Sequence, residues 1–265
     1  MSHDAPPASS LAANAEDTPA SPAGEAKAAH PMDMSIFVTA AAHDMKNSIS
    51  VIAAFLEDAL REMDEHNVAS AADATEAAVH SLTHRALYET QRVNGHLVQI
   101  MALFKLDQGH YPFDPEVMEL NDFAEEAAAR VRPLALVKGI QVEVLTQGLE
   151  DGEGYFDREL IFSVVVQALF NAIKYAKTRI NLSISQRDGL VEIRVEDDGA
   201  GYPAFMLERG FADRSSINNR TSSTGLGLYF ARQVAQLHRQ GTREGSTQLE
   251  NGGTFGGGCF LLTLP

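Results

Sequence analysis

The sequence predicts an α+β protein in which a long helical hairpin is followed by an α/β sandwich. Residues 1–33 are rich in Ala, Pro, Ser and Gly and offer almost no large apolar side chain, which is typical of a disordered tail. Residues 34–110 carry two long apolar stripes at helical spacing, and residues 111–265 alternate between helix-like and strand-like runs. We therefore predict three segments with these bounds.

The two apolar stripes predict the helices of the hairpin. The first runs from Val38 to Met63 and the second from Val79 to Phe104, both in steps of three or four residues. Between them, residues 65–75 are small and polar and suit a turn. Because two long helices alone cannot hide such stripes from water, we expect two hairpins to pair into a four-helix bundle, which makes the protein a homodimer. A monomeric hairpin packed on the second domain is the weaker alternative.

The remaining chain reads as a mixed sheet with helices on one face. We expect strands near residues 116–120, 140–145, 179–185, 191–195 and 259–264, and helices near residues 122–138, 157–175 and 225–238.

Composition excludes several classes of function. The formal net charge of −15 and the sequence pI of about 4.9 disfavour a nucleic acid or an anionic membrane as a partner. No apolar run approaches the roughly 18 to 20 residues that span a bilayer, so we expect a cytoplasmic protein without membrane insertion. The single cysteine, Cys259, can form no internal disulfide and is expected in the core.

The segment HDMKNS places three polar side chains on the first stripe. His43 follows the seam residue Ala42 by one step, so its ring should project to solvent beside the seam. Asp44 could hold one ring nitrogen, which would leave the imidazole a competent nucleophile near neutral pH. Asn47 lies one turn further along the same face. Taken alone, such residues on a helix are usually only a polar surface.

Two further segments combine polar side chains with glycine. In QALFNAIKYA, Asn171 and Lys174 share a helix face and could meet a metal-bound phosphate together, although both are common surface residues. In VEDDGAGYP, a strand-like run ends at Asp197, and Gly199 and Gly201 could let the backbone approach a flat ligand. A tight turn is the plainer explanation of those glycines.

The fourth segment, SSTGLGLYFARQVAQLH, begins an amphipathic helix with Gly225 and Gly227. The N–H groups and dipole at such a helix start suit an anion, although glycine there also has a capping explanation.

All four segments, in this order, resemble the bacterial sensor histidine kinases. In that family, dimerisation and phosphotransfer helices precede an ATP-binding domain of the Bergerat, or GHKL, fold, and the resemblance extends from about Ser35 to Pro265. It implies that His43 is the phosphorylated residue and that Asp44 is the adjacent acid that activates it. Ser48 stands where the family often has proline, and Gln167 replaces an upstream asparagine.

The same resemblance implies a nucleotide site. Asn171 takes the position that ligates Mg²⁺, with Lys174 and Tyr175 where the family contacts phosphate or ribose. Asp197 takes the position that hydrogen-bonds the adenine amino group. The remaining expected contacts lie in two glycine-rich boxes separated by a lid over residues 202–223: Gly199 and Gly201 in the first, and Gly225, Leu226 and Gly227 in the second. The closing run GGGCFLLTLP is expected to be only structural.

The resemblance therefore implies an enzyme that uses ATP and Mg²⁺, autophosphorylates His43 and passes the phosphoryl group to an aspartate of a response regulator receiver domain. Asn47 also resembles a water-positioning residue, so we expect phosphatase activity toward that partner as well. A phosphatase-dominated regulator and a phosphotransfer scaffold with a weak kinase are the alternatives. Only the tail precedes the hairpin in this sequence, so we expect input from a separate sensor protein.

Overall fold

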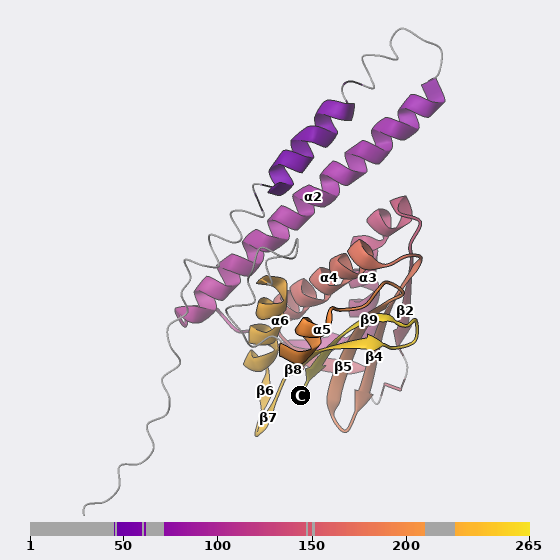
Figure 1. Ribbon diagram of the computed structural model, residues 1–265. Coiled ribbons are helices and arrows are strands. Elements are labelled where there is room, and N and C mark those ends of the chain that lie inside the picture. Colours follow the sequence, from indigo (N-terminus) through magenta and orange to yellow (C-terminus); the bar gives the residue numbers. More distant parts are fainter. Residues whose placement is uncertain are drawn as a thin grey trace, which may run out of the picture. The chain divides into compact units, whose positions relative to one another are not determined.

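The helical hairpin is present in the described part of the chain. The computed structural model describes residues 45, 47–59, 61, 72–146, 148–149, 152–209 and 226–265. Residues 47–59 are helical, and helix α2 runs from Ala72 to Asp107 (Figure 1). The two helices meet where Arg92 Nη2 donates to Ser48 Oγ at 2.6 Å. The expected tail, residues 1–33, lies outside the described residues.

Two details of the hairpin differ from expectation. The turn expected over residues 65–75 was wrong at its end, because α2 begins at Ala72 in an alanine-rich stretch with high helix propensity. The expected seam is also only partly covered within one chain. Ala86 is buried, whereas Leu97 and Phe104 are 44% and 53% exposed.

The second domain is built around a five-stranded mixed sheet. Its sheet order is β2-β4-β5-β9-β8, in which only β2 and β4 are parallel. The five strands are β2 (Gln141–Thr146), β4 (Arg179–Arg187), β5 (Leu190–Asp197), β8 (Ser246–Gly252) and β9 (Gly257–Leu264). Two small antiparallel ribbons pair β1 (Glu116–Glu119) with β3 (Glu153–Phe156), and β6 (Arg239–Gln240) with β7 (Arg243–Glu244).

Helices cover one face of the sheet (Figure 1). The helices of this domain are α3 (Leu120–Val137), α4 (Arg158–Tyr175), α5 (Ala204–Arg209) and α6 (Leu226–Leu237). Alternation along β4 sends Ile180, Leu182 and Ile184 toward α3 and α4, where all three are fully buried. The expected layer arrangement is confirmed. The elements β3, β6, β7, β8 and α5 were not predicted, because their short runs carry little periodicity.

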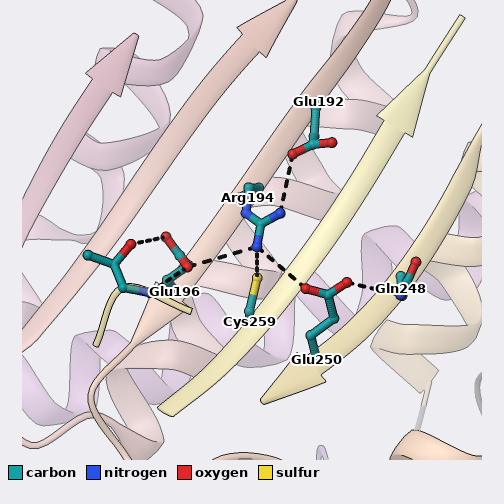
Figure 2. Close-up of polar contacts among 7 residues, drawn as sticks. Glu192, Arg194, Glu196, Gln248, Glu250 and Cys259 are labelled. Atoms are coloured by element: carbon teal, nitrogen blue, oxygen red, sulfur yellow. Dashed lines mark hydrogen bonds and ion pairs between the residues drawn. The ribbon is translucent and has the colours of Figure 1, made fainter. Parts of the chain in front are cut away.

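The opposite face of the sheet is polar and centres on Arg194 (Figure 2). The guanidinium pairs with Glu192 at 3.3 Å and with Glu250 at 3.5 Å, and it lies 3.9 Å from Glu196. It also contacts the Cys259 sulfur at 3.3 Å. Cys259 is fully buried as expected, and burial raises the pKa of its thiol to about 11, so it packs rather than reacts.

No helix among the residues described above is long and apolar enough to cross a membrane.

His238 joins the end of α6 to the start of α4. Its Nε2 accepts the backbone N–H of Asp157 at 3.0 Å, and its Nδ1 lies 2.8 Å from the carbonyl oxygen of Val234. Because Nε2 is an acceptor, the proton of the neutral ring must be on Nδ1. Asp157 in turn caps α4 by accepting from the Leu160 N–H at 3.1 Å. The neutral imidazole is therefore part of the frame that places α4.

This arrangement predicts an acid-sensitive contribution to stability. Burial lowers the pKa of His238, so the unfolded chain binds a proton more readily than the folded one. The stabilisation is therefore present above about pH 6.5, the unfolded value, and is lost as the pH falls below it. We expect the free energy of unfolding to drop less between pH 7.5 and pH 5.5 in His238→Gln than in wild type. His110→Gln, at an exposed histidine, is the control for urea denaturation at each pH, and equal slopes in all three proteins would contradict the prediction.

Candidate functional site

The candidate site is organised around Asp197, the last residue of β5. Its side chain is nearly buried, at 7% exposure. Asp197 Oδ1 accepts two backbone N–H groups, from Gly199 at 2.7 Å and from Gly258 at 3.3 Å. Burial raises the pKa of Asp197, and these two donors act in the opposite direction. Both of these hydrogen bonds are made to Oδ1, and neither uses Oδ2.

The end of α4 lies directly against this strand end. A Cβ on Gly199 would overlap the carbonyl oxygen of Tyr175, the last residue of α4, and would lie 2.8 Å from Asp197 Oδ1. Gly199 is therefore required for helix and strand to approach so closely. That Gly199 lets the backbone approach a flat ligand stays a prediction, because the partner of Gly199 in this contact is the protein's own backbone.

The expected phosphate and metal residues occupy the last turn and a half of α4. Asn171 and Lys174 are half-buried, and Tyr175 is 52% exposed. The Lys174 ammonium lies 5.1 Å from the centre of the Tyr175 ring. Asn171 is four residues before Tyr175, about 6 Å along the helix axis. All three expected residues therefore lie on the helix that abuts Gly199 and Asp197.

The start of α6 packs beside the same helix. Leu226 is buried, and a Cβ on Gly227 would lie 3.1 Å from Gln167 Cγ. Gln167 is one turn before Asn171 on α4, so the start of α6 lies near the residues expected to contact phosphate and metal. Gly225 lies outside the described residues.

The turn after Gly199 is fixed by a residue that the sequence did not single out. Gly201 has a left-handed backbone with φ of 79°. The next residue, Tyr202, donates its N–H to Asn251 Oδ1 at 2.6 Å and accepts from Asn251 Nδ2 at 2.8 Å. Asn251 and Gly258 were both missed as site residues. The only signal for Gly258 was the closing run of glycines, which was assigned a structural role alone.

The expected phosphotransfer residues are only partly described. His43 and Asp44 lie outside the described residues. Asn47 is exposed on the helix of residues 47–59. Its neighbour Ser48 is fully buried and accepts a hydrogen bond from Arg92, which itself forms an ion pair with Glu89 at 3.3 Å. Ser48 therefore occupies a regular, packed helical position.

Comparisons with known proteins identify the second domain. Residues 156–265 match the family model described as histidine kinase-, DNA gyrase B-, and HSP90-like ATPase. This range contains Asn171, Asp197 and every other residue described above around Asp197. The solved structure of the Acinetobacter baumannii histidine kinase AdeS has a TM-score of 0.55 at 15% identity, over 84% of this chain and 96% of that one. The two chains share a fold.

Curated relatives extend the similarity into the hairpin. The sensor histidine kinase RppB of Synechocystis sp. is 24% identical over 238 residues, covering 86% of this chain and 48% of RppB. The sensor histidine kinase YkoH of Bacillus subtilis is 27% identical over 209 residues, covering 76% of this chain and 42% of YkoH. The chain spans about half the length of the curated relatives it matches.

The close approach at Gly199 predicts a severe effect of a single methyl group. Gly199→Ala should lower the free energy of unfolding by about 1–3 kcal/mol, because its Cβ would overlap backbone that cannot move freely. Gly95→Ala in α2 is the matched control, since its Cβ would meet nothing closer than Gln167 Oε1 at 3.9 Å. That change should stabilise by about 0.5–1 kcal/mol through helix propensity. Similar urea midpoints for the two variants would show that the approach seen at Gly199 is not required.

Proposed function

We propose that the chain is a protein-histidine kinase of the bacterial sensor histidine kinase family, which uses ATP to phosphorylate His43. The phosphoryl group then passes to an aspartate of a response regulator receiver domain. The observation that carries the proposal is the Asp197 carboxylate, which is held by two backbone N–H groups at the end of a strand inside the matched ATPase domain.

Asp197 suits the recognition of adenine. A carboxylate whose Oδ1 is already engaged can offer Oδ2 to the amino group of adenine, which is a hydrogen-bond donor. A base with a carbonyl oxygen at that position would face the carboxylate as a second acceptor and be rejected. Because Asp197 is nearly buried, the bond would form away from competing water.

Different residues around Asp197 would contact the other parts of the nucleotide. Lys174 and Tyr175 would meet phosphate or ribose at the end of α4, and Gly201 would line the turn beside the base. Gly225, Leu226 and Gly227 would present the start of α6 to the phosphates, where helix N–H groups favour an anion.

Asn171 fits a magnesium site that is completed by the nucleotide itself. Among the described residues, no three His, Cys, Asp or Glu side chains gather to hold a metal ion. Mg²⁺ is commonly held in proteins by one or two side-chain oxygens together with substrate phosphates and water, and the Asn171 carboxamide can supply one such oxygen. When bound, the ion neutralises charge on the phosphates during transfer.

The proposed transfer needs an activated imidazole beside the bound nucleotide. A nitrogen of His43 attacks the γ-phosphorus, the bond between that phosphorus and the bridging oxygen to the β-phosphate breaks, and ADP leaves. Asp44 holds the other ring nitrogen and favours the charged ring that develops. The product, phosphohistidine, is then the donor to the partner's aspartate.

Homodimerisation is part of the proposal because both hairpin helices expose apolar side chains. On α2, Leu97, Met101 and Phe104 are 44%, 58% and 53% exposed and follow one another at helical spacing. On the first helix, Ile49 and Leu56 are 57% and 47% exposed and lie seven residues apart. Burying these side chains against a second copy in a four-helix bundle would contribute about 25 cal/mol per Å² of apolar surface.

Phosphatase activity toward the phosphorylated response regulator is a second proposed activity. It is favoured by the exposure of Asn47 on the surface of the first hairpin helix. A phosphatase-dominated regulator, or a scaffold with a weak kinase, would keep Asn47 important but make ATP turnover slow.

The kinase proposal predicts an acid-labile, alkali-stable phosphoryl label after incubation with γ-³²P-ATP. His43→Gln should abolish the label while leaving the affinity for ADP unchanged, because His43 belongs to the expected hairpin segment, residues 34–110, and Asp197 to the expected ATP-binding segment, residues 111–265. Asp197→Asn should weaken ADP binding by tenfold or more, since the carboxamide can present a donor where the adenine amino group needs an acceptor. Wild-type labelling in His43→Gln, or unchanged ADP affinity in Asp197→Asn, would overturn the corresponding assignment.

The two activities should separate at Asn47. Asn47→Ala is expected to keep most autophosphorylation and transfer but to lose most of its acceleration of phosphoaspartate hydrolysis, because only the water-positioning carboxamide is removed. Asp44→Ala should instead impair the kinase step. Decay of the phosphorylated response regulator in the presence of ADP measures the effect, with Glu57→Ala as an exposed control on the same helix. Decay by Asn47→Ala at the wild-type rate would remove the proposed role.

A further inference from the structure

The Asn251 side chain holds both backbone groups of Tyr202. Its Oδ1 accepts the Tyr202 N–H at 2.6 Å, and its Nδ2 donates to the Tyr202 carbonyl at 2.8 Å. A carboxamide is the only ordinary side-chain group of this size that can accept and donate in this way at once. The pair of bonds therefore fixes both the position and the orientation of the Tyr202 peptide units.

The strand that carries Asn251 is tied to the rest of the candidate site. Asn251 is paired with Gly258 across the β8–β9 ladder, and the Gly258 N–H donates to Asp197 Oδ1. In the turn between the strands, the Thr254 N–H donates to Glu196 Oε1 at 3.1 Å. The β8–β9 hairpin therefore holds the 196–202 segment at three residues. Thr254 contacts Glu196, Gly258 contacts Asp197 and Asn251 contacts Tyr202.

Gly201 is shaped to this contact. Its φ of 79° is a left-handed conformation that favours glycine. A Cβ at this position would lie 2.6 Å from Asn251 Oδ1, too close for the carboxamide to keep its place. The backbone at Gly201 and the side chain of Asn251 therefore depend on each other.

The Tyr202 side chain links this turn to the surroundings of Asp197. Its ring lies beside Gly258, where a Cβ would be 3.1 Å from Tyr202 Cε2. Burial raises the pKa of the Tyr202 hydroxyl, and the neighbouring Asp197 charge raises it further. A shift of the Tyr202 backbone would therefore move a half-buried ring whose hydroxyl is affected by the Asp197 charge.

We propose that Asn251 is a positioning residue of the nucleotide site, which sets the Gly201–Tyr202 turn at the distance from Asp197 that adenine binding requires. The inference rests on the proposed nucleotide-binding function. Asn251 acts through the Tyr202 backbone and is not itself a catalytic residue.

The test uses the full chain and titration calorimetry with ADP. Asn251→Asp has nearly the same size and shape but lacks the donor and sets a charged acceptor against the Tyr202 carbonyl, and Asn251→Ala lacks both groups. Both variants should weaken ADP binding by about tenfold, which corresponds to about 1.4 kcal/mol. Asn251→Gln keeps donor and acceptor and should recover most of the affinity. Asn121→Ala is the control, because this exposed asparagine bonds Thr146 away from the site.

Hydrogen exchange provides a readout that does not depend on nucleotide. Without ADP, the Tyr202 amide should exchange faster in Asn251→Ala than in wild type, whereas the Val195 amide in β5 should be unchanged. Wild-type affinity in both Asn251→Asp and Asn251→Ala would show that the two bonds do not set the site, and unchanged Tyr202 exchange in Asn251→Ala would show that the bonds do not hold the turn. Either result overturns the inference. Failure of wild type itself to bind ADP would instead overturn the proposed function.

Discussion

A carboxylate taken out of water must be given hydrogen-bond donors, and the architecture of the candidate site follows from meeting that requirement at Asp197. The donors are backbone N–H groups, which reach Oδ1 only where no side chain intervenes. One comes from the turn that follows β5 and the other from β9. Gly199 and Gly258 are the residues at those two places. These two glycines therefore supply the hydrogen bonds to the Asp197 carboxylate, and Gly199 also lies in the turn that follows β5.

The same requirement binds distant elements together. Because Gly199 carries no side chain, the end of α4 can meet the end of β5, which brings the helix of Asn171 to the carboxylate. Because Gly258 lies across from Asn251, the β8–β9 hairpin that supplies a donor to Asp197 also anchors Tyr202. A one-residue slip of the β8–β9 register would reverse the face of Asn251 and disrupt its contact with Tyr202.

The hairpin helices differ from the second domain in which side chains they bury. Within one chain, polar side chains such as Glu89, His96 and Gln99 are buried while Leu97 and Met101 are exposed. Buried polar groups in a helical bundle contribute little net stability but can fix which positions face one another. The exposed apolar side chains are the part that a second copy would cover. The folding of the nucleotide domain thus rests on its own core, whereas the hairpin's apolar surface is consistent with pairing.

The sequence by itself determined the order and kind of the long elements, because a period of 3.6 residues in α4 or of 2 residues in β4 is written along the chain. It also indicated Asp197 and Asn171 through the residues next to them. Tertiary structure alone decided that Gly258, 61 residues from Asp197, donates to its carboxylate, and that Asn251, 49 residues from Tyr202, holds its backbone. Periodicity reports which side of its own element a residue faces. Which residue of another strand lies opposite depends on ladder register, and that is fixed only when the strands pair.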